Sequence, residues 1–196
     1  YDPAFAGEMA VIVDAGMREM LVEQRDVFYY ITLMNENYAQ PDLPTDAHAH
    51  VLRGCYRFGT FGPSDAKQKV TLMGSGAILT EVIKAAKTLA DEGIASDVFS
   101  VTSWSELARD GQACDVAGEV SFVARQLADT GGPVIAATDY VRAVPESIRA
   151  FVPQGRRYVT LGTDGFGRSD TRAALRRFFG VDAASVAQAA RRALAD

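Results

Sequence analysis

Apolar residues recur at three- and four-residue steps over residues 4–23 and predict a helix with one buried face, whereas Glu8 and Asp14 fall off that face. The following run, residues 27–33, is β-branched and aromatic with almost no polar alternation. Such a run is typical of a strand covered on both faces in a parallel sheet. The two patterns together predict the closing helix and strand of an α/β fold.

A break in composition follows the predicted strand. Residues 35–45 are rich in Asn and Asp and include Pro41 and Pro44, so they continue neither element. We therefore expect a domain boundary here, with residues 1–45 as the end of one domain plus its linker and residues 46–196 as a second domain.

Helical and strand-like patterns alternate through the second part of the chain. Helices are expected at 46–54, 78–90 with a stop at Gly93, from 104 onward, at 170–179 and at 183–195. Strands are expected at 55–59, 70–73, 98–101, 133–137 and 157–161, with a loop or short helix near 145–151. This alternation predicts an α/β fold with a doubly wound, mainly parallel sheet and helices on both faces.

Composition narrows the function classes. The chain has 196 residues, and its 20 Lys and Arg against 25 Asp and Glu give a net charge of −5, which disfavours binding to nucleic acid or anionic lipid. No apolar run approaches the roughly 18 residues of a membrane span. Two cysteines build no disulfide framework, so a cytoplasmic setting is expected. Because the chain begins at Tyr1 without Met, we expect a piece of a longer protein.

The turn Gly74-Ser75-Gly76 follows a predicted strand and opens a helix, where backbone N–H groups and the helix dipole can receive an anion. It lacks the third glycine of a dinucleotide fingerprint and the lysine of a P-loop. A tight strand-to-helix turn is therefore the preferred interpretation, and an anion loop the alternative.

Histidine and cysteine offer little chemistry. His48 and His50 would point in different directions on a helix, so a solvated linker is favoured over a metal pair. Cys55 adjoins an apolar strand and Cys114 is expected in a polar turn. Neither has a neighbouring His, so inert packing or exposure is favoured over a nucleophilic role.

Two further motifs precede predicted helices. In the stretch 164–170, Asp164, Phe166, Arg168 and Asp170 are expected to form a structural or interface motif: an ordered turn with Phe166 as its hydrophobic plug and Ser169 or Asp170 as the helix cap. The stretch 103–111 begins with a capping box in which Ser103 and Glu106 each satisfy the other's backbone N–H. A paired-carboxylate site at Glu106 and Asp110 is the less favoured alternative.

The residues Asn35, Glu36, Asn37 and Tyr38 leave the carboxyl end of the predicted strand at 27–33. Ligands of parallel α/β sheets bind beyond such ends. Two interpretations of these residues are equally open: they line a ligand site, or they form an ordinary turn at the end of the strand.

Several ordered motifs at consistent spacing resemble the C-terminal part of the bacterial homodimeric pyruvate dehydrogenase component, a thiamine diphosphate-dependent decarboxylase of the transketolase-like superfamily. The resemblance covers residues 1 to about 183. It rests on Tyr1-Asp2-Pro3-Ala4-Phe5-Ala6, residues 28–32 with 35–38, Leu72-Met73-Gly74-Ser75-Gly76, residues 100–111, Thr138-Asp139-Tyr140 and residues 161–170.

This resemblance implies that the chain up to about Leu33 ends a pyrimidine-binding domain and that a transketolase C-terminal domain starts near Asp46. It implies that thiamine diphosphate and Mg²⁺ bind upstream of Tyr1, so this chain carries no catalytic residue, binds neither cofactor alone and is inactive in isolation. The segment 118–132 is shorter than the family pattern, which leaves contacts made there open.

The resemblance also implies an activity for the longer protein. That protein would be a homodimer that decarboxylates pyruvate and reductively acetylates the lipoyl group of the dihydrolipoyl acetyltransferase. In transketolases an Arg near the position of Asn35 meets the substrate phosphate, so Asn35 suits pyruvate. This chain would bury the dimer interface and line the substrate entrance with residues 35–38. A free-standing anion-binding or regulatory module using Gly74, Ser75 and Gly76, or a purely structural interaction domain, remains the alternative.

Overall fold

The computed structural model describes residues 1–195 and contains one five-stranded sheet with the order β1-β3-β2-β4-β5. The strands are β1 (Cys55–Phe61), β2 (Lys69–Gly74), β3 (Ala95–Val101), β4 (Val134–Ala137) and β5 (Tyr158–Leu161). β3, β2, β4 and β5 run parallel, and β1 pairs with β3 antiparallel at one edge. The predicted α/β fold with a mainly parallel sheet is confirmed.

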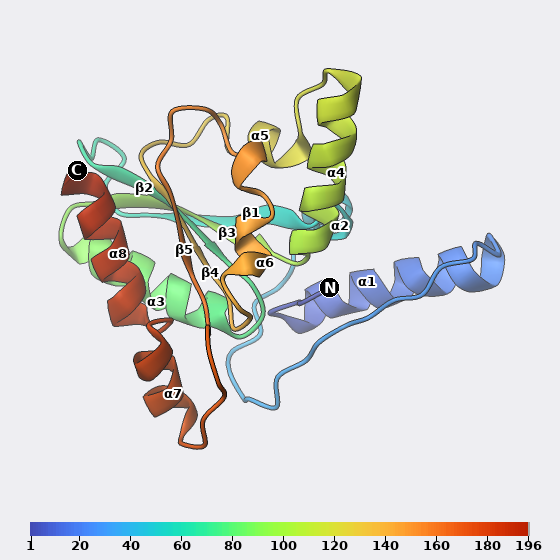
Figure 1. The fold of residues 1–196 in the computed structure, drawn as a ribbon, viewed down its shortest axis with the longest axis horizontal. Helices are drawn as coiled ribbons and strands as arrows, with labels where there is room; N and C mark the ends of the chain where they lie inside the picture. The colour runs from blue at the N-terminus through green and yellow to red at the C-terminus, as the bar shows by residue number, and fades with distance from the viewer. Residues whose placement is uncertain (196) are drawn as a thin grey trace.

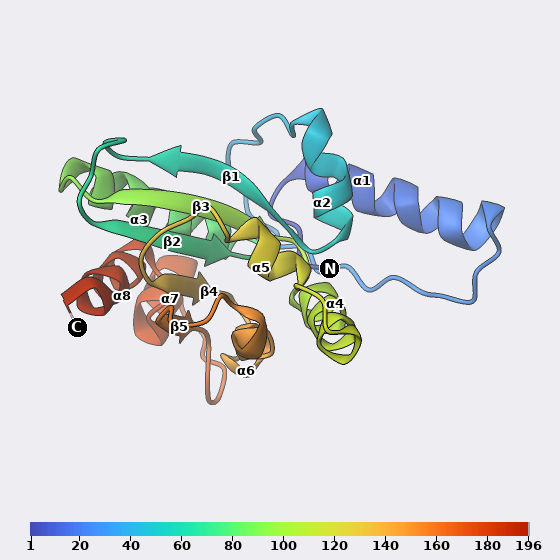
Figure 2. The same cartoon turned by 90° about the horizontal axis from the view of Figure 1, so that it is seen from above.

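Helices cover both faces of the sheet (Figures 1 and 2). One face packs against α3 (Ile78–Asp91) and α8 (Ala183–Ala195), and the other against α4 (Trp104–Ala117) and α5 (Phe122–Gln126). Side chains of a strand alternate between faces, so Leu72 of β2 lies in the first core and Met73 in the second. Other helical segments follow β4 along the chain. They are α6 (Ala143–Glu146), a 3-10 turn at Arg149–Phe151 and α7 (Arg172–Phe179).

The first forty residues lie beside this sheet rather than in it. They form α1 (Ala6–Met17), which ends in a π-helical turn at Arg18–Val22, and an extended segment that returns along the helix (Figure 1). A 3-10 turn at Thr45–Ala47 then leads into α2 (His48–Leu52). Ile12 of α1 packs with Val51 and Tyr56 in a third, small core.

The prediction of a strand at residues 27–33 is wrong, because this segment has no strand partner and its backbone is extended coil. Tyr29 stacks on the Tyr1 ring at 5.7 Å and Ile31 packs on the third core, whereas Phe28 and Tyr30 on the other side are 87% and 73% exposed. Alternating burial of this kind shows that only one side of the segment is covered.

Three local predictions also need correction. Glu8 is fully buried instead of lying on the polar side of α1, because its carboxylate caps the start of the helix and reaches into the sheet. Cys114 lies in α4 and not in a turn, because that helix continues to Ala117. The helix α5 at Phe122–Gln126 was not expected; it starts at Ser121, whose hydroxyl accepts the Ala124 N–H.

Within residues 1–195, the structure contains no helix with the length and apolar character that a membrane crossing requires.

Candidate functional site

The carboxyl ends of β2 and β4 form the crevice in which sheets of this kind usually bind ligands. From β2 the chain passes through α3 to β3 on one side, and from β3 it returns across to β4 on the other. Strand order therefore changes direction between β2 and β4, which is the usual ligand position. Two hydroxyls meet here: Ser75 Oγ lies 2.9 Å from Thr138 Oγ1, and both residues are fully buried.

Asp2 lies on the β2 side of this crevice, against the turn at Gly76. Its backbone N–H donates to the Thr102 carbonyl at 2.7 Å, and its carbonyl accepts the Gly76 N–H at 3.0 Å. Its carboxylate accepts from Thr32 Oγ1 at 2.8 Å. Burial raises the pKa of Asp2, while hydrogen bonds from Thr32 and Ser75 oppose that shift. The predicted anion loop at Gly74, Ser75 and Gly76 is thus in contact with a carboxylate of the same chain.

The glycine at position 76 is required by this arrangement. Its φ is +51°, in the left-handed region, and a Cβ there would lie 2.6 Å from Asp2 Oδ1. This is therefore a tight strand-to-helix turn. Gly76 has a strained, left-handed backbone angle, and the Asp2 carboxylate lies directly against it.

Glu8 is a second buried carboxylate contributed by the first forty residues. It accepts the Ala4 N–H at 2.6 Å and the Phe5 N–H at 3.1 Å, and on the sheet side the Tyr56 hydroxyl at 2.9 Å and the Ser100 hydroxyl at 2.5 Å. Burial raises the pKa of Glu8, and the four donors oppose that shift. The carboxylate joins α1 to β1 and β3.

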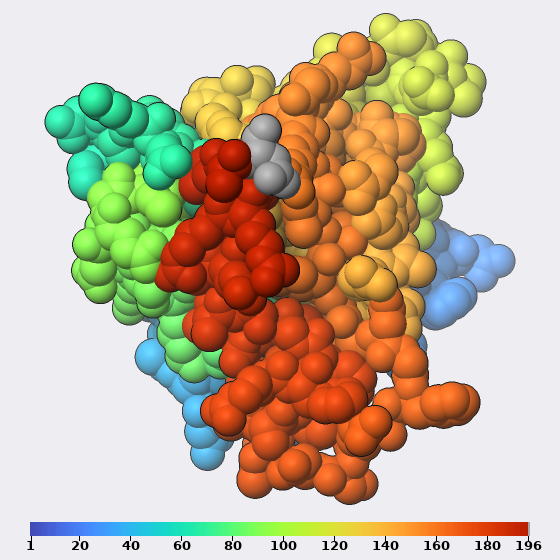
Figure 3. Space-filling view, turned by 60° about the vertical axis from the view of Figure 1, so that its left-hand side comes forward, coloured from blue at the N-terminus to red at the C-terminus, as the bar shows by residue number. Residues whose placement is uncertain are grey.

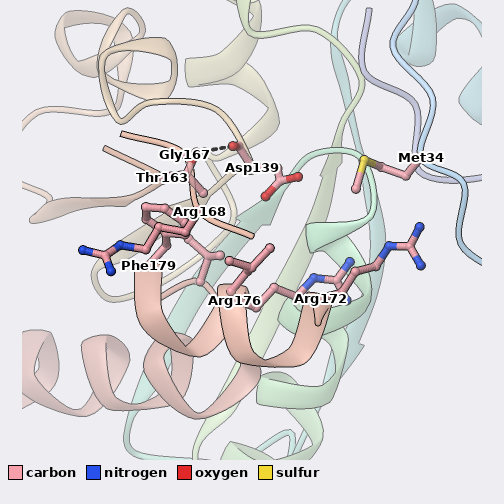
Figure 4. Close-up of a pocket in the computed structure, with 10 residues that line it drawn as sticks. Met34, Asp139, Thr163, Gly167, Arg168, Arg172, Arg176 and Phe179 are labelled. Atoms are coloured by element: carbon pink, nitrogen blue, oxygen red, sulfur yellow. Dashed lines mark hydrogen bonds between the residues drawn. The ribbon is translucent and has the colours of Figure 1, made fainter. Parts of the chain in front are cut away.

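Next to the crevice lies a cavity of about 270 Å³ between the Met34 segment, the end of β4 and α7. Figure 4 shows Asp139 on one side, Arg172 and Arg176 of α7 on the opposite side and Met34 at one end. Thr163 Oγ1 donates to the Asp139 carbonyl, and burial raises the pKa of the Asp139 carboxyl. A desolvated carboxylate beside a cavity at a strand end is typical of functional sites.

An ion-pair cluster forms one wall of this cavity. Arg176, whose side chain is buried, donates to both carboxylate oxygens of Glu36, at 3.1 Å and 2.5 Å, and to Glu81 at 3.3 Å. The Arg172 guanidinium donates to the Asn35 carbonyl. These contacts hold the segment 34–38 against α7 and α3.

The structure places the four residues Asn35 to Tyr38 at this cavity edge, but not at the end of a strand, because residues 27–33 form none. Glu36 is paired with Arg176, and the Tyr38 hydroxyl donates to the Ala4 carbonyl at 2.5 Å. Asn35 and Asn37 are exposed. Their role in lining a substrate entrance stays a prediction.

The loop 164–170 differs from its predicted form. Phe166 is 96% exposed rather than a hydrophobic plug, because the loop bends outward between two exposed glycines, and this orange-red part of the chain forms the lower edge of the molecule in Figure 3. The cap of α7 is Thr171, whose hydroxyl accepts the Ala174 N–H, and not Ser169 or Asp170.

Three side chains of this loop have local partners. The Arg142 backbone N–H and guanidinium both donate to the Asp164 carboxylate and hold its pKa below the usual range. The Arg168 guanidinium lies 4.2 Å from the centre of the Phe178 ring. The Asp170 carboxylate accepts the Thr171 N–H at 2.7 Å.

The predicted capping box at residues 103–106 is half correct. Ser103 Oγ accepts the Glu106 N–H at 3.2 Å, as predicted, but the Ser103 N–H donates to the Gly54 carbonyl. Glu106 is consequently free to pair with Arg109, and it does so across one turn of α4. The Asp110 carboxylate accepts a hydrogen bond from the Phe122 N–H at the start of α5 and forms an ion pair with Arg53.

Histidine and cysteine add no metal site. Residues 1–195 contain no group of three His, Cys, Asp or Glu side chains arranged to hold a metal ion. His48 is exposed on α2, and His50 lies on Phe122 with ring centres 5.5 Å apart. Burial raises the pKa of the Cys55 thiol to about 12, which makes it unreactive.

The sequence analysis missed Asp2, Glu8, Asp139 and Arg176 as site residues. Asp139 had a signal, since it follows a predicted strand at its carboxyl end. Glu8 had a weaker one, since a carboxylate in the first turn of a helix can satisfy the free N–H groups there. Asp2 and Arg176 have partners 30 to 140 positions away, so no local pattern indicates them.

Comparison with known proteins gives two family matches. Residues 54–182 match the transketolase-like TK C-terminal domain, and residues 1–41 match the pyruvate dehydrogenase E1 component middle domain. Among curated proteins, the chain is 48% identical along its whole length to the pyruvate dehydrogenase E1 components of Cupriavidus necator and Pseudomonas aeruginosa, and 46% identical to that of Mycobacterium tuberculosis. It spans only 22–23% of the length of these relatives.

Solved structures show the same fold. The transketolase of Pichia stipitis in complex with sedoheptulose-7-phosphate aligns with all of this chain and 25% of its own, with a TM-score of 0.63 at 16% identity. The Leishmania mexicana transketolase aligns with 76% of this chain and 19% of its own, with a TM-score of 0.52 at 21% identity.

Proposed function

The chain belongs to the family of the transketolase-like TK C-terminal domain, and from its similarity to pyruvate dehydrogenase E1 components we propose that it serves as the C-terminal part of such a component. The observation that carries this proposal is the order of the two family matches. An E1 middle-domain segment at residues 1–41 leads into the C-terminal domain at 54–182 within one chain that is 48% identical to the Cupriavidus relative throughout.

The exposed arm of the molecule supports this proposal. We define the arm as residues 17–34, the far end of α1 with its π-helical turn and the extended segment that returns from it (Figure 2). It exposes eight large apolar side chains. These are Met17, Met20, Leu21, Val22, Phe28, Tyr30, Leu33 and Met34. A concentration of exposed large apolar side chains in one segment is typical of a surface that contacts protein. The proposed occupant is the remainder of the E1 middle domain, against which residues 27–33 would pair as the strand that the sequence predicts.

We propose the corresponding division at about residue 45, with residues 1–45 completing the pyrimidine-binding domain and 46–196 forming the C-terminal domain. In the longer enzyme, thiamine diphosphate with Mg²⁺ would act as the electron sink for pyruvate decarboxylation, followed by reductive acetylation of the acetyltransferase's lipoyl group. We assign no step of that chemistry to residues 1–195, which contain no group of three His, Cys, Asp or Glu side chains that could hold a metal ion.

The proposed contribution of this chain is positional. Glu36 and Tyr38 are anchored to Arg176 and Ala4, which fixes the backbone of the segment between Met34 and Gln40. Asn35 and Asn37 remain exposed on that fixed segment and would line the substrate entrance without a positive charge. Such a lining suits pyruvate, which has no phosphate. Homodimerisation and a cytoplasmic location belong to the same proposal.

Reconstitution tests the proposal. The E1 component of Cupriavidus necator, expressed without the segment that this chain matches, is mixed with the chain, thiamine diphosphate and Mg²⁺, and pyruvate-dependent dye reduction is measured. We expect activity only from the mixture. A double variant of the arm, Leu21→Asp with Phe28→Asp, should abolish it, whereas Val116→Asp, at a 91% exposed position of α4, should not.

Two results would contradict the proposal. The first is calorimetric binding of thiamine diphosphate with Mg²⁺ by the isolated chain, which would place the cofactor site here. The second is a mixture that forms a complex by sedimentation yet has no activity above that of the truncated enzyme. Inorganic phosphate binding at Gly74–Gly76 of the isolated chain would instead favour an anion-binding module.

A further inference from the structure

We propose that Asp2 is a built-in ligand of the β2–α3 turn, beside the crevice between β2 and β4, and that its carboxylate fixes residues 1–3 and the Thr32 segment on the sheet. The crevice that binds soluble ligands in other α/β sheets would here recognise an acidic side chain of the same chain. This inference concerns contacts within residues 1–195 and does not depend on the proposed enzyme activity.

The contacts of Asp2 are of the kind that a bound ligand makes. Its backbone bridges two strand ends, through the Thr102 carbonyl beyond β3 and the Gly76 N–H beyond β2. Its carboxylate accepts a hydrogen bond from the Thr32 hydroxyl at 2.8 Å. Asp2 therefore connects the returning segment, the β2–α3 turn and the end of β3.

The crevice is suited to a negative charge. The turn leads directly into α3, a helix of 14 residues, whose first N–H groups carry partial positive charge. The Asp2 carboxylate lies against the Cα of Gly76, where any larger residue would displace it. A small carboxylate at a helix start, on a glycine and beside a hydroxyl donor, matches the chemistry expected of an external anion in this position.

An external anion would compete with contacts that this turn already makes. The Gly76 N–H donates to the Asp2 carbonyl and the Ser75 N–H donates to the Ala137 carbonyl, so both are already used. The Ser75 hydroxyl is also engaged, with Thr138. Binding of phosphate at this turn would require Asp2 to leave, and with it residues 1–3 and the Thr32 segment.

Chemical rescue tests this inference. Asp2→Ala removes the carboxylate, and amide hydrogen exchange is followed by NMR at two reporters, the Gly76 N–H that bonds to Asp2 and the Thr32 N–H that bonds to Tyr1. We expect hydrogen exchange at both N–H groups to become about tenfold faster, because each of these hydrogen bonds can open without unfolding of the sheet. Added acetate, a free carboxylate, should restore slow exchange at Gly76 in Asp2→Ala.

Two controls make the test decisive. Asp14→Ala, at an exposed position of α1, should change neither reporter and should not respond to acetate. Asp2→Asn keeps the side-chain volume and loses the charge, so it should show fast exchange like Asp2→Ala; should Asp2→Ala fail to fold, Asp2→Asn decides the question. Wild-type exchange rates in a folded Asp2→Asn would overturn the inference.

Inorganic phosphate provides a second readout on the same variants. We expect phosphate to shift the Gly74–Gly76 resonances of Asp2→Ala and to leave those of the wild-type chain unchanged. Equal shifts in both proteins would show that the crevice is open to soluble anions while Asp2 is present, and would overturn the inference.

Discussion

The two ends of the N-terminal segment differ sharply in how they meet the rest of the molecule. Near the sheet, Phe5, Glu8 and Ile12 are buried and Asp2 reaches into the β2–β4 crevice. At the far end, the π-helical turn of the arm projects into solvent (Figure 1), and Leu21 is 71% exposed. The same helix thus begins in the core and ends outside it.

This difference separates a polar, specific part of the N-terminal segment from an apolar part whose side chains are exposed. Buried carboxylates require donors at fixed positions, so Glu8 and Asp2 determine where the segment sits. The apolar side chains of the arm have no such directional requirement. They need only a protein surface that covers them. The anchored end therefore fixes the placement of the segment on the sheet, and the arm is the part proposed to complete a neighbouring domain.

The largest expected effect separates the sheet domain from the arm. Leu79→Ala removes a fully buried side chain of α3 and should lower the free energy of unfolding by about 3 kcal/mol. Leu21→Ala in the arm should change it by less than about 0.5 kcal/mol, because the side chain is already in water. Urea unfolding followed by circular dichroism measures both. A similar loss for the two variants would mean that the arm is packed in solution.

A second test concerns the anchored end. Glu8→Gln replaces one acceptor oxygen by an NH₂ group that faces donors, so it should lower the free energy of unfolding by about 2 kcal/mol. Asp14→Asn on the exposed side of the same helix is the matched control and should be neutral. Equal stability of the two variants in urea would show that the buried carboxylate does not anchor α1.

The stability that Glu8 contributes to the fold depends on pH, in a direction that follows from the shift in its pKa. Burial raises the pKa of folded Glu8 above its ordinary value of 4.5, so the folded state binds more protons than the unfolded state between the two values. The contribution of Glu8 to the free energy of unfolding is fully present below about pH 4.5. It is lost as the pH rises through the pKa of folded Glu8. The stability of the wild-type chain relative to Glu8→Gln should therefore decrease from acidic to neutral pH. An increase would show that the four donors outweigh burial.

The smallest expected effect compares two helical glycines. In α4, a Cβ on Gly111 would lie 2.2 Å from the Phe151 ring, so Gly111→Ala should cost about 1–2 kcal/mol despite its better helix propensity. In α1, a Cβ on Gly16 would lie 3.2 Å from the Tyr29 ring. That ring can move, so Gly16→Ala should be neutral or stabilising by about 0.5 kcal/mol in thermal unfolding. A larger cost at Gly16 would indicate that the returning segment is held rigidly.

Much of the fold follows from local sequence patterns. The helix at 78–91, its end at Gly93 and the helix start at Trp104 all depend on periodicity and caps within a few residues, and each agrees with the structure. The alternation of these elements was sufficient to predict a mainly parallel sheet with helices on both faces. The family resemblance likewise depended on short motifs that the chain carries in order.

Tertiary structure decided what these patterns leave open. A β-branched run such as residues 27–33 becomes a strand only beside a partner strand, and residues 1–195 supply none for it. Whether an acidic residue is solvated or buried depends on donors far away in sequence, as for Glu8 with Ser100 and Glu36 with Arg176. The exposure of Phe166 depends on the path of a glycine-flanked loop. Local sequence determined the elements, and only long-range contacts determined which charges they bury and where the candidate site lies.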